Sequence, residues 1–212
     1  MVKPALPRLY LIRHGETEWS RSGLHTGRTD LPLTEHGVVS ARLLRRYFAD
    51  TPFTLVLTSP LQRARETCAL AGLDTYARIS AGLSEWDYGE YEGRSSDDIH
   101  MEAPGWNVFR DGCPGGETPA QVAERADRII AGALALEGNI ALFSHGHFGC
   151  ALAARWIGLP ILEGQHFTLD PASVSVLGPK PGHPQVRVIE SWNNRPAEAS
   201  MGGHDVRSRR SE

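Results

Sequence analysis

This chain of 212 residues has few cysteines, no large excess of charge of either sign and no long apolar run. Its three cysteines, Cys68, Cys113 and Cys150, are too few and odd in number for a disulfide framework. Lys and Arg total 22 against 25 Asp and Glu, and the net charge of −3 argues against a nucleic-acid partner. No run of about 18 apolar residues occurs, so no membrane span or membrane partner is expected. Residues 1–11 hold no apolar stretch of signal-peptide length, and these absences together predict a cytoplasmic protein.

Short apolar segments of strand length alternate with helical patterns along the chain. Strands are expected at residues 8–13, 53–57, 139–143, 172–177 and 186–190, and a short one within 79–88. The segments at 172–177 and 186–190 alternate polar and apolar residues, as an antiparallel pair does. Helices are expected over residues 33–48, 59–71, 118–134 and 146–157. Thr34 and Ser59 stand where the N-caps of the first two helices belong.

This alternation predicts an α/β fold. It favours one domain built on a mostly parallel sheet with helices on both faces. Residues 89–116 are rich in turn signals and are expected to form a small loop-rich cap. We assign residues 1–194 to the domain and expect residues 195–212, which have almost nothing to bury, to form a flexible tail.

Basic side chains follow three of the expected strands at the point where each strand ends or its helix begins. Ligands of open α/β sheets bind outside the carboxyl ends of the strands, so Arg13, His14, Arg63 and His145 are expected to converge there. Arginine offers a fork of donors that fits phosphate oxygens. The helix N-termini after Ser59 and His145 would add backbone N–H groups, and the glycines after both histidines would allow close backbone approach. The sequence therefore predicts a pocket for a phosphoryl group.

A neutral histidine in such a pocket can attack phosphorus, and the departing alcohol then needs a proton. Glu85 is the preferred general acid, with Asp87 and Glu90 as competing carboxylates. Each of these residues taken alone has a common structural alternative. A lone Arg-His-Gly occurs on many surfaces, and His145 could be a buried histidine satisfied by a loop carbonyl. Three matching strand ends together favour the functional interpretation.

Five segments, in order along the chain, resemble the signature of the histidine phosphatase superfamily, also called phosphoglycerate mutase-like. They are residues 11–19 (LIRHGETEW), 58–64 (TSPLQRA), 83–93 (LSEWDYGEYEG), 115–118 (GGET) and 144–147 (SHGH), and the resemblance spans residues 9 to about 178. The resemblance implies a phosphorylated nucleophile at His14, a proton donor at Glu85, and a phosphoryl group held by Arg13, Arg63 and His145. It also implies substrate or phosphate contacts at Ser20, Thr26, Gly27 and Gly146, and neither a metal nor another cofactor.

Two further segments bear on the branch of the family. Residues 20–30 and 106–113 resemble most the sedoheptulose-bisphosphatase branch and bacterial acid phosphatases. Cofactor-dependent mutases usually have asparagine where this chain has Ser20, and a longer basic insertion where this chain has residues 94–116. That segment carries two arginines against four carboxylates, a poor clamp for a doubly phosphorylated cofactor. We therefore expect a phosphatase of small-molecule phosphomonoesters, either sugar phosphates or a broad range.

Several alternatives stay open at this point. A mutase, a phosphoprotein phosphatase and a non-catalytic phosphate-binding module would share the same pocket. His145 and His147 could hold a metal, but Cys150 is expected to point onto another helix face. The oligomeric state is open, with a homodimer as one alternative. Trp86 and Trp106 could line the substrate mouth or brace a loop. The three arginines Arg21, Arg28 and Arg110 could contact the rest of the substrate or be solvated surface charges.

Overall fold

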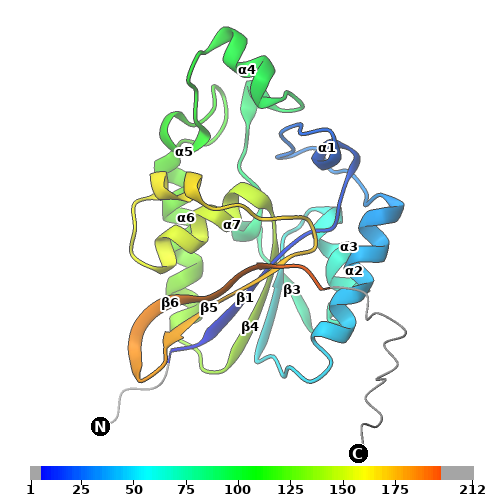
Figure 1. Cartoon of the computed structure of the whole chain (residues 1–212), viewed down its shortest axis with the longest axis vertical. Helices are drawn as coiled ribbons and strands as arrows, with labels where there is room; N and C mark the ends of the chain where they lie inside the picture. The colour runs from blue at the N-terminus through cyan, green and yellow to red at the C-terminus, as the bar shows by residue number, and fades with distance from the viewer. Residues whose placement is uncertain (1–5, 197–212) are drawn as a thin grey trace, which may run out of the picture.

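A six-stranded sheet forms the centre of the computed structural model, which describes residues 6–196 (Figure 1). The strand order is β3-β2-β4-β1-β5-β6. The parallel strands are β1 (Arg8–Arg13), β2 (Leu55–Thr58), β3 (Ala77–Ile79) and β4 (Asn139–Ser144). The antiparallel strands at one edge are β5 (Val174–Lys180) and β6 (His183–Asn194). The predictions of a mostly parallel sheet and of a final antiparallel pair are confirmed.

Helices cover both faces of this sheet (Figure 1). Helices α2 (Glu35–Tyr47) and α3 (Gln62–Leu70) lie on one face, and Leu44, Phe48 and Cys68 form a core there with apolar side chains of the strands. Helices α6 (Pro119–Leu134) and α7 (Gly146–Trp156) lie on the other face. Phe148, Leu152 and Trp156 of α7 are buried there against the sheet. Each face thus has its own apolar layer, as the fold prediction requires.

The predicted cap at residues 89–116 lies beyond the carboxyl ends of the parallel strands (Figure 1). It contains the short helices α4 (Ser96–Glu102) and α5 (Val108–Asp111) and the 3-10 turn η3 (Gly89–Tyr91). The other short elements are α1 (Glu18–Arg21), η1 (Asp74–Tyr76), η2 (Ala81–Leu83) and η4 (Ile161–His166). The cap leaves the strand ends accessible from one side, where the basic residues were expected.

The predicted N-terminal residues cap α2 and α6 but not α3. The Thr34 side chain accepts from the N–H of Gly37 and caps α2 as predicted, and Thr118 caps α6. The prediction that Ser59 caps α3 is wrong, because α3 begins at Gln62. The Ser59 hydroxyl is hydrogen-bonded to His145 instead, and the N–H of Gln62 donates to Asp30 at 2.6 Å. The Ser59 hydroxyl thus serves the site, and it also accepts from the N–H of Leu61 just before the helix.

The short strand expected within 79–88 is also misplaced. Strand β3 occupies residues 77–79, and the chain from 80 onward follows an irregular path. Arg125 donates to the carbonyls of Gly82, Ser84 and Glu85 and holds this irregular segment in place. In addition, β2 begins at Leu55, two residues later than predicted.

The predicted tail, residues 195–212, lies outside the described residues except for its first two positions. Of these, Arg195 lies 3.9 Å from the carboxylate of Asp170. Within residues 6–196, no helix is long and apolar enough to cross a bilayer.

Candidate active site

Four side chains that the sequence predicts to converge do come together at the carboxyl ends of the parallel strands. Arg13 ends β1 and His14 follows it, Arg63 lies in the first turn of α3, and His145 follows β4. The rings of His14 and His145 lie with centroids 5.1 Å apart. A cavity of about 360 Å³ opens at this point, and Arg13, His14 and Glu85 line it.

His14 is held as a neutral ring with one nitrogen available. Its Nδ1 lies 2.7 Å from the carbonyl oxygen of Gly15, and a carbonyl only accepts, so Nδ1 carries the hydrogen. Burial lowers the pKa of His14 well below its ordinary value, and the positive charges of Arg63 and Arg13 lower it further. At neutral pH the lone pair is therefore on Nε2, the nitrogen that a phosphoryl acceptor needs.

Arg63 and His145 form a buried polar unit behind His14. Arg63 is wholly buried, and its Nε–H donates to Nδ1 of His145 at 3.2 Å. The remaining nitrogens donate to the carbonyls of Thr29, Thr26 and Gly27 at 2.9 to 3.0 Å. Burial, with the charge of Arg63 beside it, keeps the pKa of His145 well below its ordinary value. The neutral His145 then uses its Nε2–H to donate to the Ser59 hydroxyl at 2.8 Å.

Arg13 is the cation that faces the cavity. One of its terminal nitrogens donates to the carbonyl of Leu169, whereas its Nε is buried and has no hydrogen-bond partner among the described residues. A buried donor without an acceptor is costly in an apolar setting. The guanidinium of Arg13 is therefore arranged to receive an anion from the cavity.

Glu85 lies at the N-terminus of α7 and lines the cavity together with Arg13. Its carboxylate accepts from the N–H groups of Trp86, His147 and Phe148 at 2.7 to 3.0 Å. Carboxylates take some of the N–H groups that were expected to donate to phosphate: Glu85 accepts from His147 and Phe148 in α7, and Asp30 accepts from Gln62 in α3. The helix instead orients the proposed acid.

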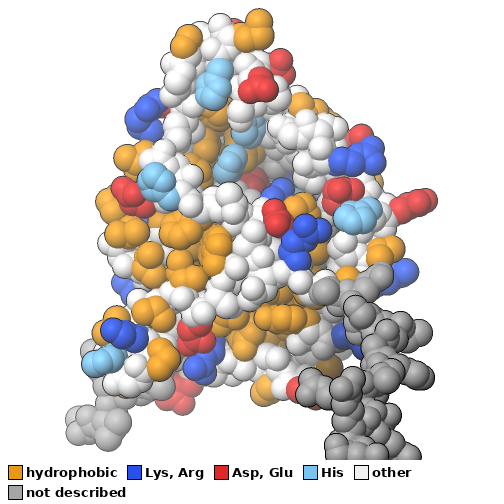
Figure 2. Space-filling view, in the orientation of Figure 1, with side chains coloured by type: hydrophobic (Ala, Val, Ile, Leu, Met, Phe, Trp, Pro, Cys, Tyr) orange, Lys and Arg blue, Asp and Glu red, His pale blue; other side chains and the backbone are white. Residues whose placement is uncertain are grey.

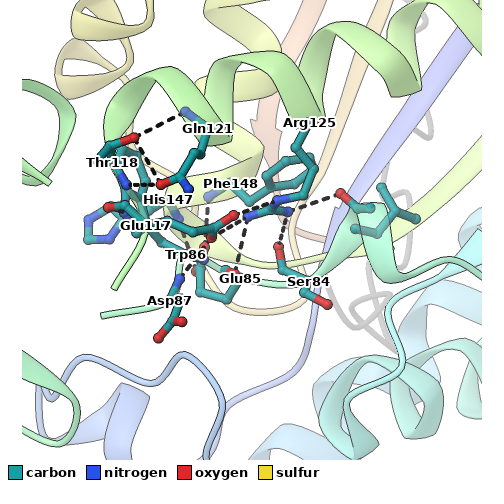
Figure 3. A network of polar contacts seen from close by, with 12 residues as sticks. Ser84, Glu85, Trp86, Asp87, Glu117, Thr118, Gln121, Arg125, His147 and Phe148 are labelled. Carbon is teal, nitrogen blue, oxygen red and sulfur yellow. Dashed lines mark hydrogen bonds and ion pairs between the residues drawn. The ribbon is translucent and has the colours of Figure 1, made fainter. Parts of the chain in front are cut away.

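A second network fixes the segment that carries Glu85 (Figure 3). Arg125 of α6 donates to the carbonyls of Ser84 and Glu85 at 2.7 and 3.3 Å and forms two hydrogen bonds with the carboxylate of Glu117. Glu117 also accepts from the N–H of Asp87 at 3.0 Å. The guanidinium lies 4.3 Å over the Phe148 ring, so one arginine links the Glu85 segment to α6 and α7.

The four predicted binding residues differ in their positions. Ser20, Thr26 and Gly146 line the cavity. Gly27 does not, and its N–H donates to the carboxylate of Glu92 at 2.9 and 3.0 Å. A Cβ on Gly146 would lie 3.5 Å from Arg13 Cζ, an ordinary contact. Gly15 is different, because a Cβ added there would lie 2.7 Å from the carbonyl oxygen of Gly37 in α2. This glycine therefore allows close packing against α2 rather than the approach of a ligand.

The structure also settles the residues whose place was open. Arg21, Arg28 and Arg110 pair with Glu18, Asp87 and Asp111, and none of the three lines the cavity. Trp86 and Trp106 brace the cap: their indole N–H groups donate to the carbonyls of Glu117 and Gly112. The expectation that Cys150 points away is wrong, because it lines the cavity one turn beyond Gly146.

Sequence reasoning missed the far wall of the cavity. Figure 2 shows histidine side chains in the hollow between the α4 cap and the body of the molecule. His25, Tyr88, His147 and Phe167 supply rings to this wall. Tyr88 lies in the segment that resembles the acid-donor motif, and His147 lies in SHGH, so both were visible in the sequence. Nothing in the spacing of His25 or Phe167 predicts their position.

A family model matches the part of the chain that forms this pocket. The model of the histidine phosphatase superfamily (branch 1) matches residues 9–194. The chain belongs to this superfamily. The family prediction made from five motifs is therefore confirmed, and the matched region includes every residue of the cavity lining.

Several similar proteins carry phosphatase names. An acid phosphatase of Mycobacterium tuberculosis is 42% identical over 188 residues, which cover 86% of this chain and 91% of the relative. A sedoheptulose 1,7-bisphosphatase of Saccharomyces cerevisiae is 39% identical over 190 residues, with 73% of this chain and 69% of the relative covered. The solved structure of the open reading frame Rv3214 product from Mycobacterium tuberculosis superposes with a TM-score of 0.85 at 38% identity, covering 90% of this chain and 99% of that one. The predictions of a phosphomonoester hydrolase and of its branch are confirmed.

Proposed function

We propose that this chain hydrolyses phosphomonoesters of small molecules in two steps, with His14 as the nucleophile. The neutral ring of His14 carries the proposal: its Nδ1 hydrogen is fixed on the Gly15 carbonyl, and the Nε2 lone pair is left for phosphorus. In the first step Nε2 bonds to phosphorus as the P–O bond to the alcohol breaks. Water then breaks the P–N bond and releases phosphate.

Charge stabilisation comes from the residues around His14. Arg13, with its unpartnered Nε, binds the oxygens of the phosphoryl group. Arg63 and His145, which were predicted to hold the phosphoryl group, do not line the cavity. The His145 ring packs against His14, and the nearby charge of Arg63 adds to that of Arg13. Ser20, Thr26 and Gly146 line the cavity where the remaining oxygens and the alcohol would lie.

Glu85 handles the proton in both steps. As an acid it protonates the departing alcohol oxygen, and as a base it takes a proton from the attacking water. Its backbone donors and the Arg125 network support this role, because they hold the carboxyl group toward the cavity that also holds Arg13 and His14.

The test combines one variant with a trapping measurement. His14→Ala should lose at least about a thousandfold in kcat on an aryl phosphate, because it removes the proposed nucleophile. Rapid acid-free quenching of the wild-type protein with phosphorus-labelled substrate should yield protein-bound label that is stable to base and lost in acid. Full activity in the variant, or no bound label in the wild type during turnover, would end the proposal.

Phosphatase activity is favoured over mutase activity by the charges of the cap. Arg94 and Arg110 are paired with Glu102 and Asp111 within the same segment and leave no free cation there for a second phosphate. Incubation with 3-phosphoglycerate should therefore release free phosphate, whereas a mutase would form the isomer. The sugar-phosphate or broader substrate range, the cytoplasmic location and the homodimer stay predictions.

A further inference from the structure

The outer part of the cavity, away from Arg13 and His14, is a wall of rings and apolar side chains. His25 stacks at 4.7 Å from Tyr88 and 5.6 Å from His147, measured between ring centroids. Leu24, Phe167 and Leu169 line the cavity beside them. The Phe167 ring is supported from behind by Trp192 at 5.1 Å. These contacts fix the rings, which form the part of the cavity lining that would meet the alcohol part of a substrate.

This wall carries no charge at neutral pH. Burial holds the pKa of His25 at about 4 and lowers the pKa of His147, so both rings are neutral. Tyr88 is hydrogen-bonded to Nδ1 of His147 at 2.6 Å, and burial raises its pKa well above the ordinary value. Burial likewise raises the pKa of the Cys150 thiol to about 12.

The basic side chains near the cavity already have partners. Among the described residues that line it, Arg13 is the one arginine or lysine, and the proposed reaction uses it for the transferred phosphoryl group. Arg28 and Arg94, which lie in or next to the segments forming the cavity rim, pair with Asp87 and Glu102 at 2.6 and 2.9 Å. A second phosphate in the outer cavity would lose its hydration and find no cation in return.

We infer that the cavity selects phosphate monoesters whose alcohol part is uncharged and carries an aromatic ring, and that it discriminates against substrates with a second phosphate. This inference rests on the proposed function, since it assigns the alcohol subsite of the same reaction. A ring of the substrate would lie against the faces of His25 and Phe167. The specificity thus departs from that named for the yeast relative, a bisphosphatase.

The first experiment uses two matched substrate pairs with the wild-type protein. Benzyl phosphate and ethyl phosphate release alcohols of similar acidity and differ in the ring. 3-Hydroxypropyl phosphate and propane-1,3-diyl bisphosphate differ in the second phosphate alone. We expect kcat/KM to be about tenfold higher for benzyl than for ethyl phosphate, and at least about tenfold higher for the monophosphate than for the bisphosphate.

Two variants of the wall locate the effect. Leu24→Arg places a cation in the lining and should raise the ratio of bisphosphate to monophosphate kcat/KM about tenfold over Leu24→Gln, the uncharged control of similar length. Phe167→Ala should lower the benzyl-to-ethyl ratio of kcat/KM from about ten toward one, because the substrate ring loses its partner in the wall. Circular dichroism of each variant verifies that it is folded.

The outcomes separate the two proposals. If none of the four substrates releases phosphate, the hydrolase proposal itself fails. If all four are hydrolysed with equal efficiency, the hydrolase stands and the inference about the alcohol subsite is overturned. An unchanged bisphosphate ratio in folded Leu24→Arg would also overturn it, because the wall would then not govern the second charge.

Discussion

Arg63 donates its Nε–H to Nδ1 of His145 at 3.2 Å, although 82 residues separate the two in the sequence. The contact sets the tautomer of His145 and leaves its Nε2–H for Ser59. The other nitrogens of Arg63 hold three carbonyls of the loop at residues 26–29. One buried guanidinium therefore connects the loop on one side of the cavity to the histidine that backs the nucleophile.

The planar fork of Arg63 is expected to be irreplaceable by lysine. Arg63→Lys keeps the charge but provides a single nitrogen for acceptors that lie in different directions. We expect kcat/KM on an aryl phosphate to fall at least about a hundredfold, and the free energy of unfolding to fall by about 2 kcal/mol because buried acceptors lose their donors. Steady-state kinetics and urea denaturation measure the two effects. If Arg63→Lys keeps the wild-type kcat/KM and the wild-type free energy of unfolding, Arg63 does not hold the loop and His145 together.

The Arg125–Glu117 pair is expected to act on catalysis through the position of Glu85. Arg125→Met and Glu117→Gln release the Glu85 segment from α6, which weakens proton donation. We expect kcat on ethyl phosphate to fall about 10- to 100-fold, and kcat on p-nitrophenyl phosphate to fall much less, because nitrophenolate leaves without a proton.

A matched control lies on the same helix. Arg128 and Glu124 form an exposed ion pair on α6, with 62% and 70% of their side chains accessible. Arg128→Met removes an equivalent charge and is expected to change neither substrate's kcat. Equal losses on both substrates in Arg125→Met would show a general structural defect rather than a role in positioning the acid.

Protonation of His25 is expected to destabilise the folded chain in acid. The pKa of His25 is about 4 in the folded state, below the ordinary value of about 6.5 in the unfolded chain. Between these values the unfolded state binds a proton that the folded state does not, so stability falls as the pH drops below 6.5. The contribution is about 1 kcal/mol per pH unit.

Urea denaturation from pH 4.5 to 7.5 measures this dependence. His25→Gln removes the titrating group, and its free energy of unfolding should therefore decline less steeply in acid than that of the wild type. Gln can still hydrogen-bond toward Ser96, the partner of His25 Nε2 at 3.2 Å. Parallel curves for the two proteins would mean that His25 titrates normally in the folded state.

Gly116 is expected to tolerate no side chain. A Cβ at this position would lie 2.2 Å from the carbonyl oxygen of Asp87, and backbone cannot move aside cheaply. Gly116→Ala should lower the free energy of unfolding by about 2 kcal/mol or more. The control is Gly132→Ala in the last turn of α6, where nothing lies within 4 Å, and this change should raise stability by about 0.5 to 1 kcal/mol. Urea denaturation measures the free energy of unfolding of both variants. A loss of stability in both would contradict the expectation that only Gly116 lacks room for a side chain.

The sequence by itself determined the layers of the fold and the place of the site. Apolar runs at residues 8–13 and 139–143 are long enough for buried strands, and both strands form there. Caps such as Thr34 act on neighbouring backbone within one turn, so local spacing predicts them. Arg13, His14, Arg63 and His145 follow strand ends, and parallel topology must then bring them to one edge.

Only the tertiary structure decided which partner each polar group has and which residues line the outer part of the cavity. Ser59 could cap a helix or bond a histidine, and the choice depended on His145, 86 residues away. The N–H groups of α7 could have faced an anion, but Glu85 from a separate loop occupies them. His25 and Phe167 reach the cavity through loops whose paths no periodicity encodes. Local propensity acts over a few residues, whereas these contacts depend on packing between distant segments.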